Sequence, residues 1–363
     1  MTKPQHHPLR GLVVAQFFGA YNDNAFKLFV ALLSIRAVRA ATGGEGPAFE
    51  AASQSRTTLA FVVFTLPLVL VSLPAGFLAD RVSKRSVILG MKGMEIVLMA
   101  AGATALFMNP TGVALPLILL GMMGVQTAFF SPAKYGILPE ILPHDRLSAG
   151  NGLLEMWTFI AIIAGTATGG PLLDATGRSA WIAGAVLTSL AVVGFLAART
   201  IPRVPPARSE GGFVVTLRGA WSSIRADRVL WMAVIGSTYF WGVTSLLGQD
   251  VLVYIKTVLG ASDSRSGIPL ALFGLGVGAG TVLAGKLSAS KVEYGLLPLG
   301  SVGLALFTIL LGGIAPGFGG TLVLMACLGI TSGLLVVPLN AILQWRSPAD
   351  RRAALLQCGQ PDA

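Results

Sequence analysis

The chain alternates between long apolar stretches and short polar ones. A helix that crosses a bilayer needs about 20 mostly apolar residues. Ten stretches are of this kind, and the first and fifth are the most polar: 11–35, 57–79, 86–108, 112–131, 151–172, 179–198, 229–249, 267–287, 295–315 and 320–341. The pattern therefore predicts an all-α membrane protein with about ten transmembrane helices.

The composition favours a membrane protein over a soluble enzyme. Only 12% of the 363 residues are charged and 54% are hydrophobic, whereas soluble domains carry about 25% charged residues. Cys327 and Cys358 lie far apart and form no metal or disulfide pattern. No nucleophile, metal cluster or acid–base pair assembles from the sequence, so we expect a protein without enzymatic activity, metal or cofactor.

The net charge of +10 is compatible with nucleic-acid binding, but basic residues also accumulate in the cytoplasmic loops of membrane proteins. With the N-terminus in the cytoplasm, the cytoplasmic side holds roughly three times as many Lys and Arg residues as the other side. This bias predicts a multi-pass protein with a cytoplasmic N-terminus and no nucleic-acid partner.

The longest predicted cytoplasmic loop divides the chain into two parts. It contains three prolines and six arginines, and a basic loop after six helices is typical of transporters built from two six-helix halves. We predict an N-terminal six-helix bundle (1–198), a basic cytoplasmic linker (199–228), an incomplete C-terminal bundle of four helices (229–345) and a polar tail (346–363).

The short loop between the second and third stretches carries a G-x-x-x-D-R-x-x-K-R motif. Gly76 permits close helix approach, and Asp80 is placed to cap the following helix. Arg81, Lys84 and Arg85 can pair across the loop or anchor at lipid headgroups. A basic loop that only sets orientation is the simpler alternative. The spacing resembles the signature of the major facilitator superfamily, which implies that these five residues take part in gating.

The first stretch contains polar residues at membrane depth. Gln16, Asp23 and Lys27 fall on one helical face, and Asp23 and Lys27, four residues apart, can form an ion pair. An ionisable residue in the bilayer is a functional candidate by default. A purely structural ion pair is the alternative, but Asn22 and Asn24 add hydrogen-bonding capacity beyond what such a pair needs. We therefore favour a substrate-binding role.

Other polar and small residues have simpler interpretations. Lys92 and Glu95, three residues apart, are predicted to form an intrahelical pair. Glu155 lies on a polar stripe, where cavity lining and structural pairing stay open. The Gly165-x-x-x-Gly169 spacing predicts close packing against another helix.

Several segments narrow the resemblance to one family. Together with the loop motif, they closely resemble the bacterial lysophospholipid transporter family, especially the transporter module fused to a phospholipid acyltransferase and an acyl–acyl-carrier-protein synthetase. The segments are 21–27, 129–140, 151–159 and 338–344. The likeness runs from about Gln16 to Arg352.

This resemblance implies a substrate, a location and a site. It implies transfer of lysophospholipids such as lysophosphatidylethanolamine from the outer to the inner leaflet of the bacterial inner membrane, where the acyltransferase would re-acylate them. The acyltransferase/acyl–acyl-carrier-protein synthetase is therefore an expected partner. Membrane lipids are the other expected partners. Asp23 is the expected headgroup contact, followed by Asn22, Asn24, Lys27 and Glu155.

The end of the chain departs from the family pattern. The family continues beyond Arg352 with two further helices, and the sequence here turns polar. We therefore expect a truncated major facilitator fold with six plus four helices. Two alternatives stay open: a facilitator transporter for another amphiphile, sugar or drug, and a non-transporting membrane scaffold beside an acyltransferase.

Overall fold

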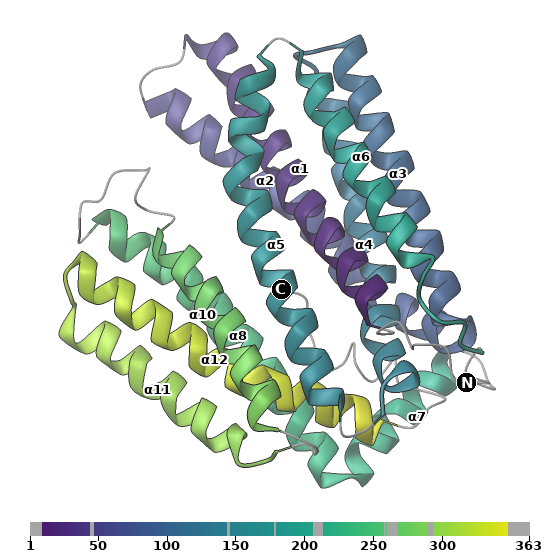
Figure 1. Cartoon of the computed structure of the whole chain (residues 1–363). Helices are drawn as coiled ribbons and strands as arrows, with labels where there is room; N and C mark the ends of the chain where they lie inside the picture. Colours follow the sequence, from purple (N-terminus) through teal and green to yellow (C-terminus); the bar gives the residue numbers. More distant parts are fainter. Residues whose placement is uncertain are drawn as a thin grey trace. The chain divides into compact units, whose positions relative to one another are not determined.

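The structure is all-helical (Figure 1). A computed structural model describes residues 9–43, 47–143, 146–177, 179–205, 213–257, 259, 268–288 and 293–347. Within these ranges the helices are α1 (Arg10–Thr42), α2 (Pro47–Arg81), α3 (Lys84–Met108), α4 (Ala114–Ile141), α5 (Leu147–Thr176), α6 (Ala180–Ala198), α7 (Phe213–Ala226), α8 (Arg228–Thr257), α10 (Ile268–Leu287), α11 (Leu296–Ile314) and α12 (Phe318–Arg346).

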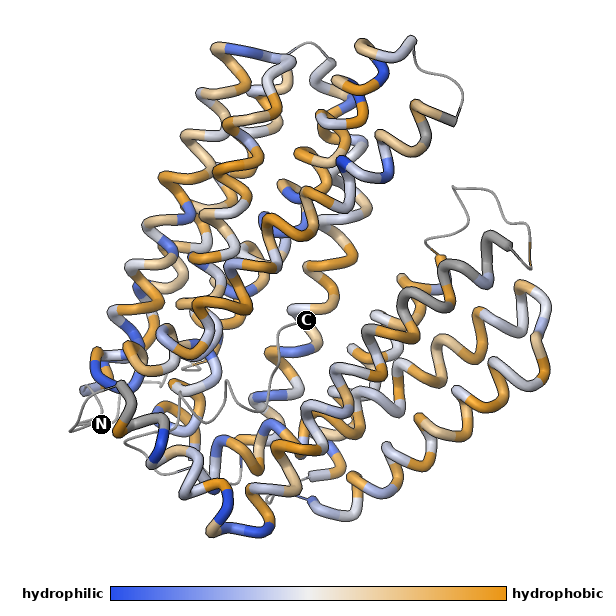
Figure 2. The backbone as a smooth tube through the Cα atoms, turned by 180° about the vertical axis from the view of Figure 1, so that it is seen from behind, coloured by the Kyte–Doolittle hydropathy of each residue, from blue (hydrophilic) through white to orange (hydrophobic). Residues whose placement is uncertain are grey.

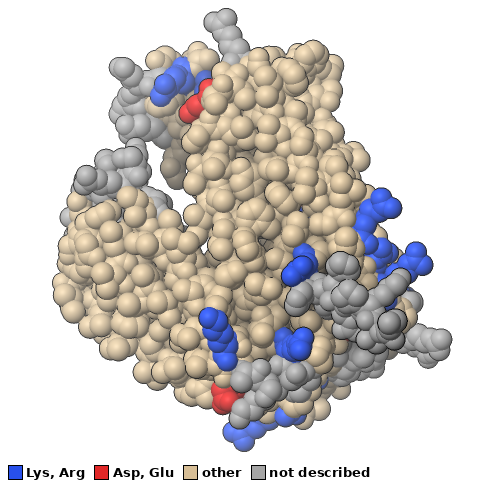
Figure 3. Space-filling model, in the orientation of Figure 1, with Lys and Arg blue, Asp and Glu red and all other residues tan. Residues whose placement is uncertain are grey.

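Each of the ten predicted stretches falls on a helix, and the chain is a multi-pass membrane protein. Among the described residues, eight helices are long and apolar enough to cross a membrane: α2, α3, α4, α5, α6, α10, α11 and α12. Because α1 and α8 fall outside this group, the count of about ten spans stays a prediction. Apolar residues predominate along the helices (Figure 2). On the face drawn in Figure 3, a broad area carries no charged side chain.

Two helices differ from the expected pattern. α2 begins at Pro47, ten residues before the predicted stretch, and has Pro67 and Pro74 in its interior. Interior prolines are tolerated in membrane helices because neighbouring groups satisfy the freed backbone. The amphipathic helix α7 lies in the predicted basic linker (199–228), in which no helix was predicted.

The helices group into two compact units, which are described separately. The first unit comprises Met1–Lys134 and Ala161–Pro206, and the second comprises Tyr135–Ile160 and Ala207–Ala363. The end of α4 and the first half of α5 therefore group with the C-terminal helices. The division into a bundle that ends at residue 198, a linker and a second bundle that begins at residue 229 stays a prediction.

Small residues let the helices of the first unit approach closely. A Cβ on Gly165 would lie 2.5 Å from the Tyr21 carbonyl oxygen, and a Cβ on Gly169 would lie 3.2 Å from Ala25 Cα. The predicted close-packing face on α5 is therefore confirmed, and its partner is α1. Phe26 of α1, which is 1% exposed, belongs to the hydrophobic core of this unit.

Glycines on both helices hold α10 against α12 in the second unit. A Cβ on Gly280 of α10 would lie 2.1 Å from the Ile330 carbonyl oxygen of α12. Conversely, a Cβ on Gly329 of α12 would lie 2.2 Å from the Phe273 carbonyl oxygen of α10. Reciprocal contacts of this kind are typical of membrane helices that associate through small residues.

Asp227 separates α7 from α8 and caps the start of α8. Its Oδ1 accepts hydrogen bonds from the backbone N–H groups of Val229 (2.9 Å) and Leu230 (3.2 Å), and its Oδ2 pairs with Arg346 at the end of α12 (3.1 Å). Partial burial acts to raise the pKa of Asp227, but these donors and the guanidinium outweigh it and hold the pKa below its usual range.

Candidate functional site

The polar side chains of α1 differ in burial and in the groups that they contact. Asn22 is fully buried, while Asp23, Asn24 and Lys27 are partly buried. Asn24 bonds back to the Ala20 carbonyl oxygen of its own helix at 2.8 Å. The other three side chains contact different neighbouring helices of the first unit.

Asn22 connects α1 to a buried ion pair on α3. Its Nδ2 donates to Glu95 Oε1 at 2.9 Å and to the Leu187 carbonyl oxygen of α6 at 3.2 Å. Glu95 Oε2 in turn pairs with Lys92 Nζ at 2.6 Å, and both side chains of this pair are 1% exposed. The predicted intrahelical pair is therefore confirmed, but it is joined to the proposed substrate site through Asn22.

The sequence provides space for the Lys92 ammonium. A Cβ at Gly19 of α1 would lie 2.3 Å from Lys92 Nζ, so any larger residue at this position would displace the lysine. Lys92 Nζ also lies 4.9 Å from the centre of the Phe130 ring, a favourable cation–π distance. A glycine, an aromatic ring and a carboxylate thus surround this buried cation.

Asp23 points to α4. Thr127 Oγ1 donates to Asp23 Oδ2 at 3.0 Å, and the neighbouring Gln126 anchors α4 to α3 by donating to the Met91 carbonyl oxygen at 3.2 Å. Asp23 Oδ1 and Asn22 Oδ1 are also buried, and no described residue donates a hydrogen bond to either atom. Two buried acceptors on adjacent residues are thus left open, and buried polar atoms are usually paired.

The ion pair that the spacing of Asp23 and Lys27 allows is not formed among the described residues. Lys27 Nζ instead lies 5.1 Å from the centre of the Phe61 ring and 5.0 Å from that of Phe64, both on α2. Among the described side chains, no contact of 4 Å or less joins the two charged groups. The charges of Lys92 and Glu95 act on Asp23.

The loop motif ties the start of α3 to the chain that follows α6. Arg85 Nε donates to the Ile201 carbonyl oxygen at 2.7 Å and Nη2 donates to the Arg199 carbonyl oxygen at 3.0 Å. Asp80 is fully buried and Lys84 is 1% exposed. These ionisable residues therefore lie inside the protein rather than on a solvated loop.

The remaining motif residues lie at the end of α2. Gly76 is buried in this helix. Arg81, in its last turn, is exposed and stacks on the Phe77 ring, with Cζ 4.3 Å from the ring centre.

Glu155 belongs to a polar cluster of the second unit. The Tyr135 hydroxyl donates to Glu155 Oε1 at 2.7 Å, and Asn340 Nδ2 of α12 approaches the same oxygen at 3.4 Å. One turn away, Asn151 and Gln344 exchange two amide hydrogen bonds of 2.9 and 2.7 Å. Glu155 belongs to the second unit, whereas the α1 residues belong to the first.

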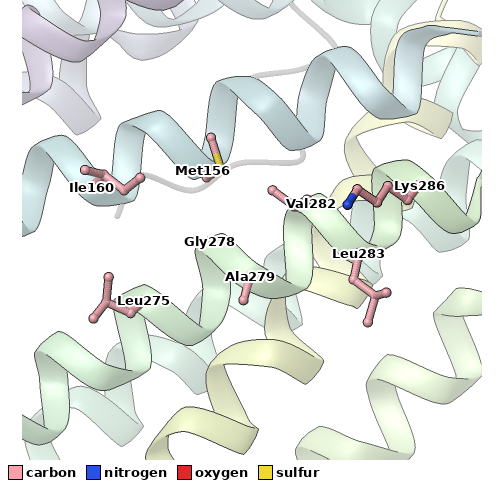
Figure 4. A pocket seen from close by; sticks show the side chains of 8 residues that line it. All are labelled: Met156, Ile160, Leu275, Gly278, Ala279, Val282, Leu283 and Lys286. Atoms are coloured by element: carbon pink, nitrogen blue, oxygen red, sulfur yellow. The ribbon is translucent and has the colours of Figure 1, made fainter.

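An apolar pocket of about 430 Å³ also lies in the second unit (Figure 4). Met156 and Ile160 of α5 and six residues of α10 line it: Leu275, Gly278, Ala279, Val282, Leu283 and Lys286. Lys286 is the single charged residue among them and lies at one end of the row (Figure 4). This lining suits a hydrocarbon chain with an anionic group near one end.

The sequence did not identify Thr127 and Gln126 as candidate site residues. For Lys92 and Glu95 it predicted only an intrahelical pair and not the hydrogen bond from Asn22 to Glu95. A polar Gln-Thr pair inside an otherwise apolar stretch was the available signal for the first two. Among the described residues, no group of three or more His, Cys, Asp and Glu side chains could hold a metal ion.

Comparison with known proteins places the chain in a family. The family model "Major Facilitator Superfamily" matches residues 12–356. The lysophospholipid transporter LplT of Photorhabdus laumondii is 30% identical over 343 residues, which are 93% of this chain and 79% of the relative. LplT of Enterobacter sp. (strain 638) is 31% identical over 342 residues, or 92% and 79% of the two chains.

Solved structures match in fold. The proton:xylose symporter XylE has a TM-score of 0.72 at 16% identity, covering 98% of this chain and 86% of its own. A bacterial homologue of the iron transporter ferroportin has a TM-score of 0.68 at 16% identity, covering 97% and 88%. At this identity the two structures support the fold alone. From the family match and the similarity to LplT, the chain belongs to the major facilitator superfamily and, within it, to the family that LplT represents.

Proposed function

We propose that this protein moves lysophospholipids across the bacterial inner membrane. The relatives that carry the name lysophospholipid transporter align with more than nine-tenths of the chain. The N-terminus would lie in the cytoplasm, as the distribution of Lys and Arg predicts. An acyltransferase, supplied with acyl groups by an acyl–acyl-carrier-protein synthetase, would re-acylate the product in the inner leaflet.

The open carboxylate oxygen of Asp23 is the observation that carries this proposal. Asp23 Oδ1 is buried in a membrane protein and receives no hydrogen bond from the described residues. A charged group at this depth is expensive unless it binds a partner. The ammonium of a lysophosphatidylethanolamine headgroup would supply both the charge and the hydrogen-bond donors that this oxygen lacks.

Lys27 is the proposed partner of the lipid phosphate. Its ammonium rests on two aromatic rings and forms no ion pair with a described carboxylate. A zwitterionic headgroup presents one charge of each sign, so an unpaired Asp23 and an unpaired Lys27 on one helix match it. Asn22, with its open Oδ1, and the partly buried Asn24 are proposed to add hydrogen bonds.

The second unit would contribute separate groups to transport. Its apolar pocket, with Lys286 at one end, suits an acyl chain, and Glu155 is proposed to contact substrate from its own polar cluster. For the loop motif, we propose a gating role for Gly76, Asp80, Arg81, Lys84 and Arg85, because the Arg85 hydrogen bonds would have to change if α3 and α6 moved apart.

The proposal predicts headgroup selectivity that depends on Asp23. The experiment measures uptake of radiolabelled lysophosphatidylethanolamine and lysophosphatidic acid, which lacks the ammonium, into spheroplasts that express the chain. Losing a hydrogen bond to a charged group costs about 1.5–3 kcal/mol. Asp23→Asn should therefore lower the uptake of lysophosphatidylethanolamine roughly ten- to hundredfold and abolish the preference over lysophosphatidic acid.

Asp174→Asn is the matched control, because Asp174 is an exposed carboxylate of the same unit that pairs with Arg36. This variant should keep both the rate and the preference. If the unmodified chain takes up neither lipid above empty spheroplasts, the proposed substrate is wrong. If uptake occurs with the same headgroup preference in Asp23→Asn, the role of Asp23 is wrong.

A further inference from the structure

Helix α7 presents a basic and aromatic face that lies outside the candidate functional site. Arg218, Trp221 and Arg225 are three and four residues apart and therefore lie on one side of the helix. Trp221 is 47% exposed, and both arginines are exposed. Ala220 and Ile224, in contrast, are 0% exposed and form part of the side that packs into the protein.

The side chains of this face contact one another. Arg225 Cζ lies 4.9 Å from the centre of the Trp221 ring, and the Trp221 and Trp231 rings meet edge to face at 5.7 Å. The exposed indole therefore has a fixed position, with Trp231 against its ring and a guanidinium beside it. Arginine and tryptophan together are typical of segments that lie at the level of lipid headgroups.

The ends of two neighbouring helices lie beside α7. Figure 1 shows α7 at the end of the second unit where α8 begins and α12 ends. The Asp227–Arg346 pair joins these two ends, and the exposed Trp345 beside Arg346 repeats the pairing of tryptophan with arginine at 5.0 Å. Because α12 is long and apolar enough to cross a membrane, we expect its last turn at the depth of the headgroups.

The region around α7 is net basic. From Phe213 to Arg228 the chain contains three arginines and a single acidic residue, Asp227, which is already engaged with Arg346 and with the backbone of α8. Helix α7 itself contains no Asp or Glu that could pair with Arg218 or Arg225. A partner for them must be anionic and must present its charge next to apolar surface, because Trp221 and Val215 (60% exposed) lie on the exposed part of the same helix.

We propose that α7 is an interfacial helix that binds anionic phospholipids of the surrounding leaflet, with Arg218 and Arg225 on the phosphates and Trp221 at the boundary between headgroup and acyl chain. Amphipathic helices with basic and aromatic residues bind membranes in this way. The surface enriches phosphatidylglycerol around the second unit. This binding is separate from transport and does not depend on the identity of the transported lipid.

Fluorescence quenching of Trp221 tests the proposal. The full chain is placed in nanodiscs of phosphatidylcholine that contain one-fifth brominated lipid, either phosphatidylglycerol or phosphatidylcholine. The difference between Trp221→Phe and the unmodified chain isolates the signal of this one residue. Brominated phosphatidylglycerol should quench Trp221 more than brominated phosphatidylcholine does, and the excess should fall to near zero in Arg218→Gln/Arg225→Gln, since each arginine contributes up to about fivefold in local enrichment.

Two further variants make the result specific. Arg218→Lys/Arg225→Lys keeps the charge and should keep most of the excess quenching. Arg39→Gln/Arg56→Gln removes two exposed arginines from α1 and α2, one of them also stacked on an aromatic ring, and should leave the excess unchanged. Equal quenching by the two brominated lipids in the unmodified chain would overturn the proposal. The proposal would also be overturned if Arg39→Gln/Arg56→Gln lost as much of the excess quenching as Arg218→Gln/Arg225→Gln does.

Discussion

Replacing Lys92 with methionine would leave the Glu95 carboxylate in the interior of the first unit without its cation. The two side chains are 1% exposed and 2.6 Å apart, so water does not compensate for the loss. Methionine has a similar length and flexibility and fills the space beside Gly19, so the substitution removes the charge with little change in packing.

The structure gives the expected size of the effect. Breaking a buried ion pair by removing one partner costs about 3–5 kcal/mol, because an unpaired charge stays behind. Replacing Glu95 with glutamine as well removes that charge and keeps an Oε1 acceptor for the Asn22 amide, which lies 2.9 Å away in the unmodified protein. The double variant should therefore recover about 2 kcal/mol or more of the stability that Lys92→Met loses.

The assay is a double-mutant cycle on the free energy of unfolding. Unfolding of the purified protein in detergent micelles is followed by tryptophan fluorescence for the unmodified chain, Lys92→Met, Glu95→Gln and the double variant. Arg36→Met is the control, because its pair with Asp174 is exposed (44% and 72%) and should contribute no more than about 1 kcal/mol. If the double variant is as unstable as Lys92→Met, a buried ion pair is not what stabilises this region.

Two further predictions concern the second unit. Gly280→Leu should lower the free energy of unfolding by about 3 kcal/mol or more, because a Cβ at this position would lie 2.1 Å from the Ile330 carbonyl oxygen. Gly312→Leu is the control and should be near neutral, because a Cβ there would have no atom within 4 Å. Equal effects of the two substitutions in thermal unfolding would contradict this packing. Asp227→Ala should cost about 1 kcal/mol at pH 7 through loss of the α8 cap. Because the folded pKa of Asp227 lies below its unfolded value of about 3.9, its stabilisation is complete above that pH and is lost as the pH falls through the folded pKa. The deficit of Asp227→Ala in unfolding titrations should therefore shrink below about pH 4, and a constant deficit would contradict this account.

The positions of the membrane helices could be predicted from the sequence because their physical cause is local. A stretch of about 20 apolar residues must be helical in a bilayer, since its backbone groups find no other partner. Helix α7 was missed for a related reason. Its arginines and the prolines before it made the region look like an irregular basic linker, although Leu217, Ala220 and Ile224, three and four residues apart, already indicate an amphipathic helix.

The contacts of the candidate site could be predicted only within one helix. The Lys92–Glu95 pair followed from a spacing of three residues. The hydrogen bonds from Asn22 to Glu95 and from Thr127 to Asp23 join residues 73 and 104 positions apart, and they depend on how α1, α3 and α4 are rotated about their axes. Hydropathy carries no information on this rotation when the helices are apolar on most sides.

The position of α1 among its neighbours explains why the spacing rule failed for Asp23 and Lys27. Polar residues on a helix that is surrounded by others find partners on whichever helix they meet first, and here Asn22 meets α3, Asp23 meets α4 and Lys27 meets α2. An i,i+4 ion pair contributes only about 0.3–0.5 kcal/mol on exposed helices, which is less than a cation–π contact in a desolvated site can provide. Lys27 therefore binds the aromatic rings of Phe61 and Phe64, and the charge of Asp23 is left without its nearest cation. That separation is what makes the pair suitable for a zwitterionic ligand, because two charges that neutralised each other would have to be pulled apart before either could bind a headgroup.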